Sequence, residues 1–117
     1  QASFLNQALI VQTSFHPEKL LFHLKKVEKS AGRVNTHKWG PRMIDIDILY
    51  YNQQVIDLPH LQIPHPEIQN RAFALIPLAE IQASFKDPRN ECSIAELLSA
   101  CEDRLTVQKV KTEENAL

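Results

Sequence analysis

Two aspartates stand inside an otherwise apolar run, WGPRMIDIDILYY, at residues 39–51. In a strand, side chains two apart share a face, so Asp45 and Asp47 would stand together with Cα atoms roughly 6–7 Å apart. In a helix they would diverge by about 200°. Carboxylates that close repel one another unless a cation lies between them, and their hard oxygens suit magnesium together with phosphates. On this pattern alone a second interpretation stays open, in which both aspartates lie on the solvated outer face of a strand or pair with Arg42.

Basic side chains flank the acidic pair on both sides in the sequence. Arg33, Lys38 and Arg42 lie in RVNTHKWGPR, which leads into it, and His65 and Arg71 lie in IPHPEIQNR beyond it. Cationic side chains neutralise phosphate oxygens, so this set indicates phosphate handling. The sequence holds no glycine-rich phosphate loop and no dinucleotide-binding turn. It also places no serine or cysteine nucleophile in a recognisable motif, which gives covalent catalysis no support.

Composition limits the wider function classes. The 117 residues, 44% hydrophobic and 23% charged, predict one globular domain over 1–117. A net charge of −1 gives no general basic field, so no nucleic-acid partner is expected. Because no apolar run reaches the roughly 18 residues that cross a bilayer and no signal peptide is recognisable, a soluble, cytoplasmic chain without a membrane partner is expected. Cys92 and Cys101 are interpreted as ordinary thiols.

The elements that must position these residues are predicted from periodicity. FLNQALIVQTS, residues 4–14, has apolar side chains on both faces and predicts a buried central strand. A helix is predicted over 17–31, with Pro17 in its first turn and Gly32 just past its end, and a basic loop should follow. MIDIDILYY, residues 43–51, predicts a strand with Ile44, Ile46 and Ile48 towards the core. NQQ offers a turn, after which VIDL, residues 55–58, would pair back as a hairpin.

The second half of the chain reads as mainly helical. LQIPHPEIQNR predicts an extended segment that leads into a helix near 72–81, despite Pro77 inside it. Ser93 with Glu96 three residues on is a capping-box start for another helix. RLTVQKV, residues 104–110, predicts a last strand, and 111–117 a frayed tail. This order of strands and helices is typical of an α+β fold.

Two stretches together resemble a known family. WGPRMIDIDILYY, followed by LQIPHPEIQNRAFALIPLAEI, is similar to the signature region of the 6-hydroxymethyl-7,8-dihydropterin pyrophosphokinases. The resemblance also takes in FLNQALIVQTS and EKLLFHLKKVEKSAGR, and so covers most of the chain. It implies a ferredoxin-like α+β sandwich with helices packed on an antiparallel sheet, represented here without the N-terminal strand–helix–strand portion of the family.

The resemblance also implies an activity and roles for individual residues. The family transfers a diphosphoryl group from ATP to the hydroxymethyl oxygen of the pterin, releases AMP, uses two Mg²⁺ ions and serves folate biosynthesis. Asp45 and Asp47 would hold the metals, and Arg33 and Arg42 would assist transfer. The residues implied to contact ATP are Lys38, Trp39, Arg42, Ile48, His65 and Arg71. Those implied to contact the pterin are Phe4, Asn6 and Phe73.

Two alternatives to an active pyrophosphokinase stay open at this point. The chain could be a truncated or degenerate form that keeps the fold without turnover. It could also be a metal-dependent phosphodiesterase that uses the same acidic pair. A missing strand would leave apolar surface and backbone groups uncovered, so self-association is expected.

Overall fold

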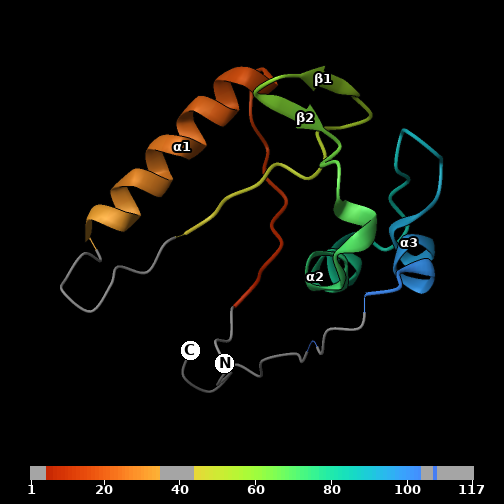
Figure 1. Cartoon of the computed structure of the whole chain (residues 1–117). Helices are drawn as coiled ribbons and strands as arrows, with labels where there is room; N and C mark the ends of the chain where they lie inside the picture. Colours follow the sequence, from red (N-terminus) through yellow and green to blue (C-terminus); the bar gives the residue numbers. More distant parts are fainter. Residues whose placement is uncertain (1–4, 35–43, 104–106, 108–117) are drawn as a thin grey trace.

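The computed structural model describes residues 5–34, 44–103 and 107 (Figure 1). The predicted strand over 104–110, the tail over 111–117 and most of the predicted basic loop therefore lie outside the described residues, apart from Val107, which is in no helix or strand. The elements, in chain order, are α1 (Pro17–Val34), β1 (Ile56–Leu58), β2 (Leu61–Ile63), the 3-10 helix η1 (Ile68–Asn70), α2 (Ala72–Gln82) and α3 (Ile94–Ala100). Their mixture confirms the predicted α+β class. None of the helices within these ranges is both long and apolar enough to cross a membrane.

Helix α1 begins at Pro17, as predicted, because proline's fixed φ and missing N–H suit the first turn. Glu18 adds a negative charge there, which favours the positive end of the helix dipole. The helix continues to Val34, so the prediction that Gly32 lies past its end was wrong. A glycine inside a helix costs only about 1 kcal/mol, which the flanking turns can offset.

The sheet in the described residues differs from the predicted hairpin. Asn52 and Gln53 do form a turn, closed by a 3.1 Å hydrogen bond from the Gln54 N–H to the Tyr51 carbonyl, and Asn52 has a φ of 51°. The segment after that turn, however, pairs with the residues that follow it in the sequence. Ile56 lies opposite Ile63 and Leu58 opposite Leu61 in an antiparallel ladder. The predicted pairing of 55–58 with 43–51 was therefore wrong, because the two-residue turn at 59–60 brings LQI directly alongside VIDL. Leu61 and Ile63 are buried while Gln62 is exposed.

Residues 5–14 and 44–51 are not strands in the described structure, although their composition predicts strands. Figure 1 shows both as coil, in red and yellow, passing between α1 and α2. A strand is defined by a ladder of hydrogen bonds to a neighbour, and no segment within the described ranges supplies one to either. The predicted burial of the first segment was also wrong: Leu5, Leu9, Ile10 and Val11 are 63–85% exposed.

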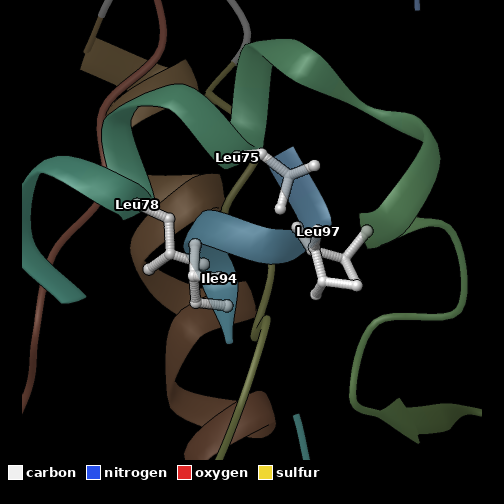
Figure 2. Close-up of a cluster of buried hydrophobic side chains, with 5 residues drawn as sticks. Leu75, Leu78, Ile94 and Leu97 are labelled. Carbon is white, nitrogen blue, oxygen red and sulfur yellow. The ribbon is translucent and has the colours of Figure 1, made fainter. Parts of the chain in front are cut away.

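The hydrophobic core lies in the C-terminal half. Leu75 and Leu78 of α2 point towards Ile94 and Leu97 of α3, and Ile68 of η1 completes the buried cluster (Figure 2). Helix α2 spans the predicted residues with Pro77 inside it. Both cysteines are free and half-buried, and both pack against this cluster, which agrees with their interpretation as ordinary thiols.

Helix α3 starts with the capping box that the sequence predicts. The Ser93 hydroxyl accepts a hydrogen bond from the Glu96 N–H at 3.0 Å, and the Glu96 carboxylate accepts one from the Ser93 N–H at 2.8 Å. These hydrogen bonds lower the pKa of Glu96. Two of the N–H groups that a helix start leaves without intrahelical partners are thus satisfied reciprocally.

We expect Ser93→Ala to lower the free energy of unfolding by about 1 kcal/mol, the usual contribution of such a cap. Urea denaturation followed by circular dichroism measures it. Ser99→Ala, near the far end of the same seven-residue helix and on its exposed surface, is the matched control and should change the free energy far less. Equal losses in the two variants would contradict the capping assignment.

Candidate active site

A cavity of about 100 Å³ brings the acidic pair together with both described pterin candidates. Asp45 and Asp47 come from the segment before the Asn52 turn, Asn6 from the N-terminal segment and Phe73 from the first turn of α2. Three parts of the chain that are far apart in sequence thus converge here. We call this the acidic cavity; its lining is completed by Gln7, Ala8, Leu49, Ala74 and Pro77.

A second cavity of about 280 Å³ adjoins the acidic pair on another side. Asp47 lines it as well, beside Ile48 and His65, two of the residues predicted to contact ATP. We call it the histidine cavity; it is also lined by Leu21, Lys25, Ile46, Pro59, His60, Leu61, Gln62 and Pro66. Asp47 is therefore shared by both cavities.

Helix α1 holds the acidic pair through a residue that sequence reasoning missed. The N–H of Ile46, between the two aspartates, donates a 2.5 Å hydrogen bond to Glu28 Oε2, and Lys25 Nζ lies 3.4 Å from Glu28 Oε1. Leu21, Lys25 and Glu28 recur at positions i, i+4 and i+7, so they share one face of α1. That spacing is the sequence signal that could have identified these three residues as neighbours, given that this face of α1 packs beside the acidic segment.

Both aspartates are exposed to solvent, as their predicted outward face requires. The isoleucines beside them follow the prediction only in part. Ile46 and Ile48 are half-buried, but Ile44 is 43% exposed, since no strand among the described residues pairs with this segment to cover it. A bound metal or phosphate would thus meet carboxylates that are already accessible.

His65 is fixed by hydrogen bonds to the main chain. Its N–H donates to the Leu49 carbonyl at 2.9 Å, and its ring Nδ1 accepts a 3.1 Å hydrogen bond from the Glu67 N–H. Burial lowers the pKa of His65, the positive charge of Arg71 lowers it further, and the charge of Asp47 opposes both. With Nδ1 as acceptor, the neutral ring carries its proton on Nε2, where it can serve as a hydrogen-bond donor.

Arg71 and Phe73, predicted for different ligands, lie against one another. The Arg71 guanidinium sits 5.7 Å from the centroid of the Phe73 ring, a cation–π arrangement. Both belong to the start of α2, whose first N–H, that of Ala72, donates to Asp103 Oδ2 at 3.0 Å. Phe73 lines the acidic cavity, whereas Arg71 lines neither cavity.

The remaining predicted site residues lie outside what the structure describes. These are Phe4, Lys38, Trp39 and Arg42. Arg33 falls in the last turn of α1. In the described ranges no group of three or more histidine, cysteine, aspartate or glutamate side chains gathers as a metal site would.

The described residues thus define an α+β protein with an acidic pair in one cavity, of which Asp47 also lines a second. Residues 1–83 match the family model of 7,8-dihydro-6-hydroxymethylpterin-pyrophosphokinase, and the chain belongs to this family, whose fold is ferredoxin-like. The family match confirms the resemblance found in the sequence.

Individual relatives agree with the family match. The chain is 48% identical over 88 residues to a 2-amino-4-hydroxy-6-hydroxymethyldihydropteridine pyrophosphokinase of Aquifex aeolicus. The aligned residues make up 75% of the chain and 55% of that protein. It is 38% identical over 98 residues to the protein of the same name from Synechocystis sp., and these residues make up 84% of the chain and 50% of the relative. A folic acid synthesis protein of Pneumocystis carinii is 45% identical over 95 residues, 81% of the chain and 13% of its own length. The chain thus spans about half the length of the two bacterial relatives.

Proposed function

We propose that the protein transfers diphosphate from ATP to 6-hydroxymethyl-7,8-dihydropterin in folate biosynthesis. In this reaction the hydroxymethyl oxygen attacks the β-phosphorus, the bond from that phosphorus to the oxygen bridging to the α-phosphate breaks, and AMP leaves. The observation that supports it most is the position of Asp47, which lines both the acidic cavity and the histidine cavity. A carboxylate at that junction can serve a reaction between two substrates bound on either side.

The histidine cavity is the proposed ATP site. Lys25 supplies a cation for phosphate oxygens, and His65 and Gln62 supply hydrogen-bond donors. Ile48 and Leu21 offer apolar surface for a flat base. Its volume of about 280 Å³ approaches the roughly 300 Å³ at which small-molecule sites begin.

The acidic cavity is the proposed pterin site. Asn6 can hydrogen-bond to a heterocycle with alternating donors and acceptors, and Phe73 can stack on its ring. Phe4 is proposed to belong to the same site. Arg71, which lies over the Phe73 ring, places a cation beside the proposed stacking surface.

Asp45 and Asp47 are the proposed ligands of two Mg²⁺ ions. The donors fit this ion, because magnesium is commonly bound through one or two carboxylates, with waters and substrate phosphates supplying the other positions. When bound, the ions would neutralise charge on the triphosphate. Arg33 and Arg42 are proposed to stabilise the transferring group, and Lys38, Trp39 and Arg71 to contact ATP, since diphosphoryl transfer needs positioning and charge neutralisation more than a covalent partner.

Product analysis on the full-length protein tests this function. With Mg²⁺, ATP and the hydroxymethyl pterin, AMP and the pterin diphosphate should form in equal amounts, and omitting the pterin should abolish AMP release. ADP in place of AMP would contradict diphosphoryl transfer. Ligand binding without product would favour the non-catalytic alternative, and hydrolysis of bis(p-nitrophenyl) phosphate without need of pterin would favour the phosphodiesterase.

We also propose that the chain, expressed as residues 1–117, self-associates. Leu5, Leu9, Ile10 and Val11 expose apolar side chains, and Phe22 and Val27 of α1 are 57% and 52% exposed. Exposed apolar surface favours association. Light scattering at increasing protein concentration should show a rising mean mass. The double variant Leu9→Ser with Val11→Ser should have a lower mean mass at the same concentration, and a wild-type protein that stays at the monomer mass would contradict self-association.

A cytoplasmic location is proposed as well. Cys92 and Cys101, both free, suit a reducing compartment.

A further inference from the structure

Asp87 is fully buried, and its carboxylate accepts four hydrogen bonds. The Arg89 main-chain N–H and Nε donate to Oδ1 at 2.8 and 3.1 Å, and Arg89 Nη2 donates to Oδ2 at 2.8 Å. The fourth donor is the hydroxyl of Tyr50, 2.7 Å from Oδ2. Three of the four bonds thus come from a residue two positions away, and one comes from 37 residues earlier in the chain.

The single distant bond reaches the segment that carries the acidic pair. Tyr50 follows Asp47 by three residues, and its ring also packs edge-on against Phe85 at 4.9 Å between centroids. Close by, the Gln53 side chain donates to the Lys86 carbonyl at 3.2 Å, so the turn after the acidic segment is held to the same loop. Nearer the start of the segment, the Glu28 carboxylate accepts a hydrogen bond from the Ile46 N–H.

These tethers matter because the acidic segment has no β-ladder within the described residues to fix its course. Its position depends on a few separate contacts: with Glu28 near its start, with His65 at Leu49, and at its end with Asp87 through Tyr50 and with the Phe15 carbonyl through the Tyr51 hydroxyl. Phosphate and metal ligands need placement within about half an ångström to act productively. A contact that fixes the end of the segment therefore affects where Asp47 lies.

We propose that Asp87, held by Arg89, is a positioning residue that fixes the Tyr50 end of the acidic segment and so places Asp47 between the two cavities. The inference rests on the proposed function and adds residues to it that touch neither substrate. The Tyr50 hydroxyl is suited to this task and not needed to satisfy Asp87, because Arg89 alone leaves three hydrogen bonds on the carboxylate. Loss of the hydroxyl should therefore loosen the Tyr50 end of the segment while leaving the ion pair intact.

Tyr50→Phe in the full-length protein is the test, because it removes the hydroxyl and keeps the ring against Phe85. We expect the Kd for Mg-ATP, measured by calorimetry, to rise about fivefold, a fraction of what a hydrogen bond to a charged group can contribute. Amide hydrogen exchange in residues 44–51, followed by mass spectrometry without ligand, should become faster, while exchange in α3 stays unchanged.

Ser93→Ala is the matched control, since it weakens the same C-terminal half through the α3 cap without touching Tyr50 or Asp87. It should lower stability and leave both the Kd for Mg-ATP and exchange in 44–51 at wild-type values. A Tyr50→Phe protein with wild-type Kd and wild-type exchange overturns the proposal, as does an equal rise of Kd in Ser93→Ala. If the wild-type protein binds no Mg-ATP, the proposed function is wrong, and the exchange rates alone decide whether the network positions the segment.

Discussion

Asp47→Ala is expected to lower the rate of AMP release by about a thousandfold, and Asp45→Ala by a similar or somewhat smaller factor. Each change removes a proposed ligand whose metal supplies several kcal/mol of charge stabilisation in the transition state, and about 1.4 kcal/mol corresponds to a factor of ten in rate. The larger effect is assigned to Asp47 because that carboxylate lines both cavities, whereas Asp45 lines one. Steady-state AMP release at saturating Mg²⁺ measures both variants.

Asp57→Ala is the matched control for the acidic pair. Asp57 is an exposed aspartate on β1, where it accepts only a long, 3.4 Å hydrogen bond from Gln62, and it lines neither cavity. The control should keep wild-type activity, and all three variants should keep wild-type thermal unfolding, because exposed carboxylates contribute little to stability. Asp45→Ala and Asp47→Ala proteins with wild-type turnover would rule out the metal assignment.

Asp87→Ala is expected to lower the free energy of unfolding by about 3 kcal/mol. The change leaves the Arg89 guanidinium without its counter-ion and the half-buried Tyr50 hydroxyl without its acceptor. Removing one partner of a buried ion pair typically costs 3–5 kcal/mol, and we take the lower end because the Arg89 side chain is 29% exposed. Urea denaturation at pH 7 measures the loss, and a change below about 1 kcal/mol would contradict it.

The same carboxylate should give stability an acid-side pH dependence. Burial alone would raise the pKa of Asp87, but hydrogen bonds from Arg89 and Tyr50 outweigh it and hold the pKa below its ordinary value. A carboxyl whose pKa is lower in the folded state stabilises the fold above its unfolded pKa of about 3.9, and this contribution is lost as the pH falls through the folded pKa. The free energy of unfolding of Asp87→Asn should therefore change less with pH than that of the wild type below about pH 4. Burial and the bond to Asp87 raise the pKa of Tyr50, so that hydroxyl stays a donor throughout this range.

Local features of the sequence were enough to predict where α1, α2 and α3 start, but not η1, which lies in a segment predicted to be extended. Pro17 at a first turn, the spacing of apolar residues in α1 and the Ser93–Glu96 capping box act within a few residues of one another, so no distant partner is needed. The acidic pair was recognisable for the same reason, because two carboxylates two residues apart in an apolar run can be read from the sequence alone, and both line the acidic cavity although their segment is not a strand. The prediction that Asn6, Phe73 and the two aspartates belong to one site came from family resemblance, and their shared cavity agrees with it.

Pairing between strands was not predictable in the same way. VIDL has the composition to pair with 43–51, yet its partner in the structure is LQI, because a ladder depends on which segment lies alongside and not on propensity alone. The apolar residues of 5–14 predicted burial, but burial needs a neighbouring surface, and those side chains remain exposed within the described structure.

By itself the sequence determined the helix starts, the α+β class, the acidic pair and the family, because each is carried by residue types at short spacing or by a motif. Only the tertiary structure decided that Asp47 lies between two cavities, that Glu28 and Lys25 face the acidic segment from α1, and that Asp87 is buried under Tyr50 and Arg89. The physical reason is distance along the chain. Contacts over 18 and 37 residues depend on how whole elements pack, and no local pattern encodes that packing.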